Sequence, residues 1–253
     1  MASKRLILQF LLKGRRLVKG TRFKGFTDVG DPVAQAVIYD AQGADEIVIV
    51  DVEASRKGAV IDPNVISAMT RQCRLPIAAG GGIRSVRDAR TCFHAGADKI
   101  VVNTAALLRP KLIRELSEEF GAQSVMVSLD VKRGPGGLPV VLACSGSKAV
   151  AGPLEEHLER AVSLGAGEIL LTSIDREGTL SGYDDGLYAR TAEKVTVPII
   201  ASGGAGCYDD LVRLFQGTAV DAAAIGKMLF LRDYDVIRIR SYLRWKGVTV
   251  RDA

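Results

Sequence analysis

The stretch from Glu46 to Gly82, EIVIVDVEASRKGAVIDPNVISAMTRQCRLPIAAGGG, decides the fold. A β-branched run at its start is followed by a helical pattern that begins at Asp62-Pro63, and a second short apolar run then ends in three glycines. Alternation of strand and helix patterns is typical of parallel βα units. It continues in both directions, with strand patterns at LILQF, EIVIV, PIAA, KIVV, SVMVSLD, EILLTS, PIIAS and DAAAI.

Eight such units in 253 residues predict a single (β/α)8 barrel that occupies residues 1–253 as one domain. Helix starts are marked by a capping side chain or a first-turn proline. Helix ends with a left-handed cap are expected at Gly43, Gly96, Gly121, Gly165 and Gly217. Two segments differ from this plan. A basic, glycine-bearing loop is expected between the first strand and the first helix, and the long loop after the fifth strand has a possible small hairpin through LPVVLAC.

An internal repeat relates the two halves of the chain. Glu46 lies 30 residues before Pro76, and Glu168 lies 30 residues before Pro198, each glutamate opening one strand and each proline the next. Because the fourth and eighth strand patterns also match, the sequence predicts two half-barrels with two equivalent anion pockets.

Composition narrows the classes of function. The net charge of +5 and pI near 9.1 suit an anionic partner, but the basic residues are spread along the chain, so no nucleic acid is predicted. Since no apolar stretch is long enough to span a bilayer and no cleavable leader is evident, we expect a cytoplasmic protein without membrane association. The cysteines are isolated and no metal-binding cluster is evident, so free thiols, no metal and no cofactor are expected.

In this fold the reactive groups lie at the carboxyl ends of the strands. The third and seventh strands run into glycine turns, and backbone N–H groups can approach an anion closely at glycines. The fourth and eighth strands end in polar pairs. A phosphorylated small-molecule substrate is therefore predicted at Gly82, Asn103, Thr104, Ser202, Gly203, Gly204, Gly226 and Lys227.

Few ionisable side chains follow strands. Asp130, after the fifth strand, is the first candidate for a general acid or base. For Asp51 a catalytic role and loop capping by the short side chain are equally favoured interpretations. For Asp175 loop capping is favoured. Glu177 and Gly178 follow in the same loop after the sixth strand.

The repeat pairs the first strand with the fifth. When Lys13 is aligned with Lys132, Leu11 falls opposite Asp130. The repeat thus predicts a carboxylate at position 11 that the sequence does not supply.

The chain resembles the cyclase subunit of imidazole glycerol phosphate synthase over nearly its whole length. The matching motifs are Lys19-Gly20, Gly30-Asp31-Pro32, Glu46 to Asp51, Gly80-Gly81-Gly82-Ile83, Gly96-Ala97-Asp98-Lys99, Asn103-Thr104-Ala105-Ala106, GAGEILLTSIDREGT, Ser181-Gly182-Tyr183-Asp184 and Ile200-Ala201-Ser202-Gly203-Gly204. The resemblance implies a barrel paired with a glutaminase subunit as a heterodimer. Ammonia from that subunit passes along the barrel axis and is used to split and cyclise a phosphoribulosyl formimino ribonucleotide.

The resemblance also implies roles for individual residues. The ammonia gate is implied at Arg5, Glu46, Lys99 and Glu168, and the glutaminase contact at Asp98. Lys19 matches the substrate-clamping lysine, and Asp130 matches one of two catalytic aspartates. Position 11 is the other aspartate in the family. The chain departs from the family pattern at three places. It has Leu11 in place of this aspartate, Glu177 in place of another aspartate, and Gly226-Lys227 in place of a small residue and serine.

Three interpretations remain open at this point. The first-strand LLKG pattern resembles a branch of the family that accompanies surface-sugar amidation, in which the barrel feeds ammonia to a third protein. Alternatively, the chain is a histidine-pathway cyclase with its proton donor moved to Asp51 or Glu177. The third interpretation is a non-catalytic phosphosugar-binding scaffold.

Overall fold

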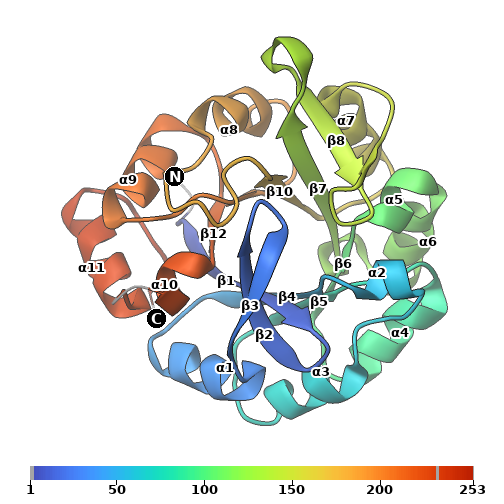
Figure 1. Cartoon of the computed structure of the whole chain (residues 1–253), viewed down its shortest axis with the longest axis horizontal. Helices are drawn as coiled ribbons and strands as arrows, with labels where there is room; N and C mark the ends of the chain where they lie inside the picture. Colours follow the sequence, from blue (N-terminus) through green and yellow to red (C-terminus); the bar gives the residue numbers. More distant parts are fainter. Residues whose placement is uncertain (1–2, 232–233, 253) are drawn as a thin grey trace.

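The computed structural model describes residues 3–231 and 234–252, and it confirms the predicted barrel. Within these residues eight parallel strands close on themselves, because the first strand pairs with both β12 and β4, and β10 pairs with both β11 and β7 (Figure 1). The barrel strands are β1 (Arg5–Lys13), β4 (Glu46–Asp51), β5 (Ile77–Gly80), β6 (Lys99–Val102), β7 (Val125–Arg133), β10 (Glu168–Ser173), β11 (Ile199–Ser202) and β12 (Ala222–Ile225).

Helices surround the barrel (Figure 1). The longer ones are α1 (Pro32–Ala41), α3 (Pro63–Thr70), α4 (Val86–His94), α6 (Lys111–Phe120), α7 (Leu154–Ser163), α8 (Asp185–Ala192), α9 (Tyr208–Gly217) and α11 (Val236–Trp245). Short helices are α2 (Ala54–Lys57), α5 (Thr104–Leu108), α10 (Lys227–Leu231), η1 (Ala122–Ser124) and η2 (Pro135–Gly137). None of the helices described is long and apolar enough to cross a membrane.

The predicted helix boundaries have the expected physical causes. The carboxylates of Asp31 and Asp62 accept hydrogen bonds from the first-turn N–H groups of α1 and α3, each of which opens with a proline. Left-handed glycines follow four helices as predicted, at Gly43, Gly96, Gly121 and Gly165. The helix α9 also ends at Gly217 as predicted, but the left-handed cap expected there was wrong, because Gly217 has no positive φ.

Apolar side chains fill two separate layers because strand residues alternate between the two faces of the barrel wall. The larger layer lies between the strands and the helices. The inner layer lies on the barrel axis and consists of Ile7, Val48, Ala78, Val101, Met126, Leu170, Ile200, Ala222 and Ala224.

Two β-hairpins stand on the carboxyl-end face of the barrel. The segment expected as a basic loop instead forms β2 (Arg16–Thr21) and β3 (Lys24–Gly30), joined by a turn in which Arg22 and Phe23 both have positive φ. That backbone geometry matches the twist of paired strands, so the turn supports a hairpin although neither residue is glycine. The hairpin predicted through LPVVLAC is present as β8 (Pro139–Ala143), which pairs with β7 and with β9 (Lys148–Ala149).

Candidate active site and charged ring

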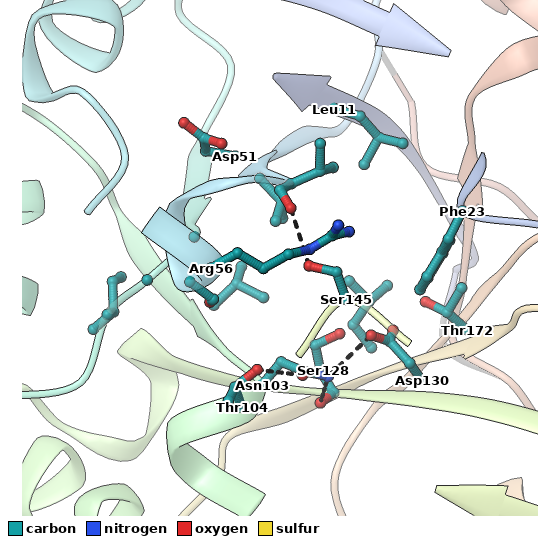
Figure 2. Close-up of a pocket in the computed structure, with 18 of the residues that line it drawn as sticks. Leu11, Phe23, Asp51, Arg56, Asn103, Thr104, Ser128, Asp130, Ser145 and Thr172 are labelled. Carbon is teal, nitrogen blue, oxygen red and sulfur yellow. Dashed lines mark hydrogen bonds between the residues drawn. The ribbon is translucent and has the colours of Figure 1, made fainter. Parts of the chain in front are cut away.

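A pocket with a cavity volume of about 100 Å³ opens at the carboxyl ends of the strands, and it is the larger of two neighbouring pockets there that the described residues form. It brings together five of the predicted site residues from β4, β5, β6 and β7 and the turns that follow them: Asp51, Gly82, Asn103, Thr104 and Asp130 (Figure 2). Leu11, from β1, also lines this pocket. Residues that the sequence predicted at the ends of different strands therefore line one cavity.

A smaller pocket of about 20 Å³ lies next to the first, with Gln9 and Leu11 in the lining of both. It brings together six of the predicted residues of the second half-barrel and Lys19 from β2. These are Lys19, Glu177, Gly178, Gly203, Gly204, Gly226 and Lys227. The Lys227 ammonium donates to the Thr21 hydroxyl over 2.7 Å, which links α10 to the first hairpin.

Two predicted residues line neither pocket. Ser202 is fully buried, and its hydroxyl donates to the Gln9 side-chain oxygen over 2.8 Å. It can position Gln9 but cannot touch a ligand without rearrangement. The Asp175 carboxylate accepts the N–H of Arg133 over 2.7 Å, so it ties the loop after β10 to the end of β7. This contact is structural, but it fastens a neighbouring strand, whereas the sequence favoured capping of the loop that carries Asp175.

Leu11 and Asp130 face the larger pocket from opposite sides of the barrel. β1 and β7 are separated by three strands in either direction around the sheet, and both residues line the cavity (Figure 2). Leu11 is 6% exposed, so its side chain is part of the packed wall. The position at which the repeat calls for a second carboxylate is therefore filled by hydrocarbon.

Asp130 has the properties of a proton carrier. Its carboxylate is buried and accepts a hydrogen bond from the Asn103 side-chain amide over 3.2 Å. Burial and the negative charge of Glu177 raise the pKa of Asp130 to about 7, and the Asn103 hydrogen bond opposes this only in part. A carboxyl group with that pKa can give or accept a proton at neutral pH.

Lys19 is buried in the wall of the smaller pocket. Its ammonium donates to the Gln9 carbonyl and lies 4.7 Å from the centre of the Phe230 ring. Burial lowers its pKa to about 7, and the charge of Glu177 opposes that shift. A Cβ at position 226 would lie 2.9 Å from the ammonium, so Gly226 leaves the room that Lys19 occupies.

The first hairpin crosses the barrel mouth and is fastened to the loop after β10 (Figure 1). The Glu177 carboxylate accepts the Phe23 N–H over 3.2 Å, and the Glu177 carbonyl accepts the Arg22 N–H over 2.9 Å. A Cβ at Gly178 would lie 2.2 Å from the Gly20 carbonyl oxygen, so glycine is required for this close approach. Because the hairpin was expected as a loop, the sequence did not identify Phe23 and Phe26 as pocket residues.

Asp51 caps the turn that follows β4. Its carboxylate accepts the N–H groups of Glu53 and Ala54 over 2.8 and 3.1 Å, while burial raises its pKa. Of the two roles weighed for Asp51, capping is present. The Thr104 hydroxyl is also engaged, because it accepts the Cys144 N–H over 2.9 Å and thereby holds the second hairpin over the pocket.

A ring of four buried or half-buried charges closes the opposite end of the barrel. Arg5 bridges Glu46 and Glu168 at 3.1 and 2.8 Å, and Lys99 bridges the same two carboxylates at 3.1 and 2.8 Å. Burial raises the pKa of Glu46, with the two cations opposing the shift. Each charge is balanced by two of opposite sign, which offsets the cost of burying all four.

Asp98, at the same end, has a structural function. Its carboxylate accepts the N–H of Ile77 over 2.8 Å and so caps the start of β5. Asp221 caps the start of β11 in the same way, through Ile199 over 2.9 Å. Asp98 is exposed, so a contact with a partner remains compatible with the capping role.

No group of three metal-ligating side chains is gathered anywhere in residues 3–231 and 234–252. Proton transfer and charge stabilisation are the chemistry that these side chains offer.

The closed sheet and the two pockets at its carboxyl end define a (β/α)8-barrel protein with its candidate active site where enzymes of this fold have theirs. Residues 10–235 match the family described as "Histidine biosynthesis protein". The chain is 42% identical over 252 residues to the imidazole glycerol phosphate synthase subunit HisF of Anoxybacillus flavithermus and 39% identical to that of Halalkalibacterium halodurans. Both alignments cover 99% of this chain and 100% of the relative. The chain belongs to the HisF family.

Proposed function

We propose that this chain is a synthase subunit that receives ammonia from a glutaminase partner and delivers it along the barrel to a phosphate-bearing site. The family's own cyclisation is impaired there. One observation carries the proposal: Leu11 occupies the wall shared by both pockets, across the barrel from Asp130. A leucine side chain can neither give nor accept a proton, so half of an acid–base pair is missing.

The charged ring supports the ammonia route. Lys99 is its most accessible member, with a side chain 20% exposed, and its displacement would open the ring. Beyond the ring the axis is filled by a layer of apolar side chains, three of which are the alanines Ala78, Ala222 and Ala224. The free energy needed to cross such an apolar layer is far lower for neutral ammonia than for ammonium or other ions. The ring and this layer together favour passage of ammonia as the uncharged molecule.

The proposed acceptor is an acetamido sugar held by a third protein, as in surface-polysaccharide synthesis. An intact ring combined with a missing carboxylate is the combination expected when delivery of ammonia is retained and cyclisation is not. In this role the glutaminase and the barrel act as a heterodimer that supplies the amidating enzyme.

A second candidate is the imidazole glycerol phosphate synthase reaction itself, in histidine biosynthesis, with Glu177 as the replacement proton carrier. Glu177 lines the smaller pocket beside Leu11, and its charge acts on both Asp130 and Lys19. The full-length similarity to subunits with that name favours this candidate as well.

Two assays separate the candidates. Ammonia delivery requires that the chain stimulate a HisH-type glutaminase, and glutamine hydrolysis unchanged by the chain would reject it. Cyclisation is measured by supplying the formimino ribonucleotide with ammonium salts. Turnover at least about a hundredfold below that of a HisF relative supports the first candidate, because loss of a general acid or base has that effect. An equal rate supports the second.

A further inference from the structure

Arg56 projects into the larger pocket. It lies in α2, and its side chain extends into the middle of the cavity (Figure 2). Among the described residues that line this pocket, Arg56 is the only cation, and the two acids are Asp51 and Asp130. The Asp51 carboxylate is already bound by backbone N–H groups. Neither the repeat nor the family motifs assign a function to Arg56.

The Arg56 guanidinium has no partner within the described residues, whereas the lysines around it do. Lys57 and Lys13 both bind the Glu53 carboxylate, at 2.7 and 3.4 Å. A guanidinium presents five N–H donors in a planar fork that matches the oxygens of phosphate or carboxylate. In Arg56 all five remain available to a ligand.

The segment that carries Arg56 is fixed against the glycine turn after β5. A Cβ at Gly82 would lie 1.8 Å from the Ala59 carbonyl oxygen, so the two backbones are in direct contact. The Ile61 N–H donates to the Gly81 carbonyl over 3.0 Å, and Arg84 donates to the Gly58 carbonyl over 2.7 Å. Arg56 is thus held beside this turn by a rigid segment, which reduces the entropy lost when it binds a ligand.

The other donors around the turn indicate what Arg56 would bind. The N–H groups of Gly82 and Ile83 make no hydrogen bond to the rest of the described chain. Two free backbone donors and a guanidinium fork that approach from different elements suit an anion with several acceptor oxygens, and the three terminal oxygens of a phosphoryl group can accept from all of them. Leu11, Phe23 and Phe26 provide apolar surface for the carbon skeleton of the ligand.

We propose that Arg56 is a specificity-determining residue of the larger pocket and that it binds the phosphoryl group of a sugar phosphomonoester. This inference rests on the proposed function for its phosphorylated substrate. It extends that function by assigning the Arg56 guanidinium as the cation that binds the substrate and a phosphoryl group as the anion.

Site-resolved titration of the full chain tests the proposal. Ribose 5-phosphate is added to isotope-labelled protein, and the dissociation constant is read from the Gly82 amide and the Arg56 side-chain N–H, with the Gly204 amide reporting the smaller pocket. Arg56→Gln is expected to weaken binding at Gly82 by about 10- to 100-fold, as loss of a charged hydrogen bond does. The matched control Lys57→Gln, one residue away and outside the pocket lining, is expected to change it less than twofold.

Three results would overturn the proposal. These are an unchanged dissociation constant in Arg56→Gln, glucuronate binding at Gly82 as tightly as ribose 5-phosphate, or shifts that occur only at Gly204. The ammonia-delivery function is read from glutaminase stimulation, which does not depend on Arg56. A failure of one proposal is therefore distinguishable from a failure of the other.

Discussion

Leu11 and Asp130 hold equivalent places in the two half-barrels but cannot do equivalent chemistry. Asp130 is buried, has a pKa near 7 and lines the larger pocket. Leu11 lines both pockets and contributes only apolar surface. The sequence alone predicted this contrast, because the repeat aligned the two strands. It could not predict the pKa of Asp130, which depends on burial and on Glu177 from the loop after β10.

Leu11→Asp is expected to raise turnover of the formimino ribonucleotide by about a hundredfold, since it restores a carboxylate at the pocket wall. The isosteric Leu11→Asn variant, which cannot exchange a proton in the same way, controls for the change in packing. Steady-state rates with ammonium salts are compared for both. Equal rates in the two variants would show that the missing carboxylate is not what limits the reaction.

The raised pKa of Asp130 predicts a pH-dependent stability. Between pH 4 and 7 the folded state holds a proton that the unfolded state has lost, so the contribution of Asp130 to stability declines as the pH rises through this window. Asp130→Asn stays uncharged throughout. We therefore compare the free energy of unfolding of Asp130→Asn with that of the wild type at each pH. The difference, variant minus wild type, is expected to be about 1–3 kcal/mol larger at pH 8 than at pH 5. Urea denaturation at both pH values measures this, and a pH-independent gain would contradict it.

The first hairpin, β2–β3, is the element that sequence reasoning missed. The charges of Lys13, Arg15, Arg16 and Lys19 led to its interpretation as a loop. The structure shows instead that Leu17 and Val18 are buried and that the turn adopts positive φ without glycine. The second hairpin was predicted because LPVVLAC is an uncharged β-branched run between glycines. Arg16 and Lys19 flank the two apolar residues of β2, so this short strand has no apolar run or alternation in the sequence, and this explains the difference.

Gly178→Ala is expected to detach the first hairpin, because the added Cβ would meet the Gly20 carbonyl oxygen at 2.2 Å. Hydrogen exchange at the Arg22 amide, which donates to Glu177, should become at least about tenfold faster. Gly136→Ala is the matched control, since its φ of 69° is close to the 67° of Gly178 but nothing lies within 4 Å. It should cost only about 1 kcal/mol of backbone strain. Equal exchange rates in the two variants would argue against a fastened hairpin.

The barrel has its charged ring at one end and its two pockets at the other, with the inner apolar layer between them. The number and order of the barrel strands were predictable because short apolar β-branched runs and helical patterns alternate throughout. The ion pairs within the charged ring were not predictable, because sequence spacing does not specify which of two cations reaches which carboxylate. The hydrogen bond from Ile77 to Asp98 was equally inaccessible from the sequence.

Lys99→Ala should open the ring while the barrel remains folded. It leaves Glu46 and Glu168 with only Arg5, at an expected cost of about 1–3 kcal/mol in the free energy of unfolding. Glutamine hydrolysis by the complex should then no longer be matched by ammonia delivered to the barrel site. The comparison is with Lys111→Ala, an exposed lysine at the start of α6. Tight coupling retained in Lys99→Ala would exclude the ring as the gate.

The most direct measurement is the turnover of the formimino ribonucleotide by the wild-type chain with saturating ammonium chloride. It is run in parallel with the HisF subunit of Anoxybacillus flavithermus, which is 42% identical to this chain. With Leu11 in the place of a proton carrier, the rate is predicted to be at least about a hundredfold lower than that of the relative. A rate within about threefold of the relative would show that the chain catalyses the full cyclisation and would contradict the impairment attributed to Leu11.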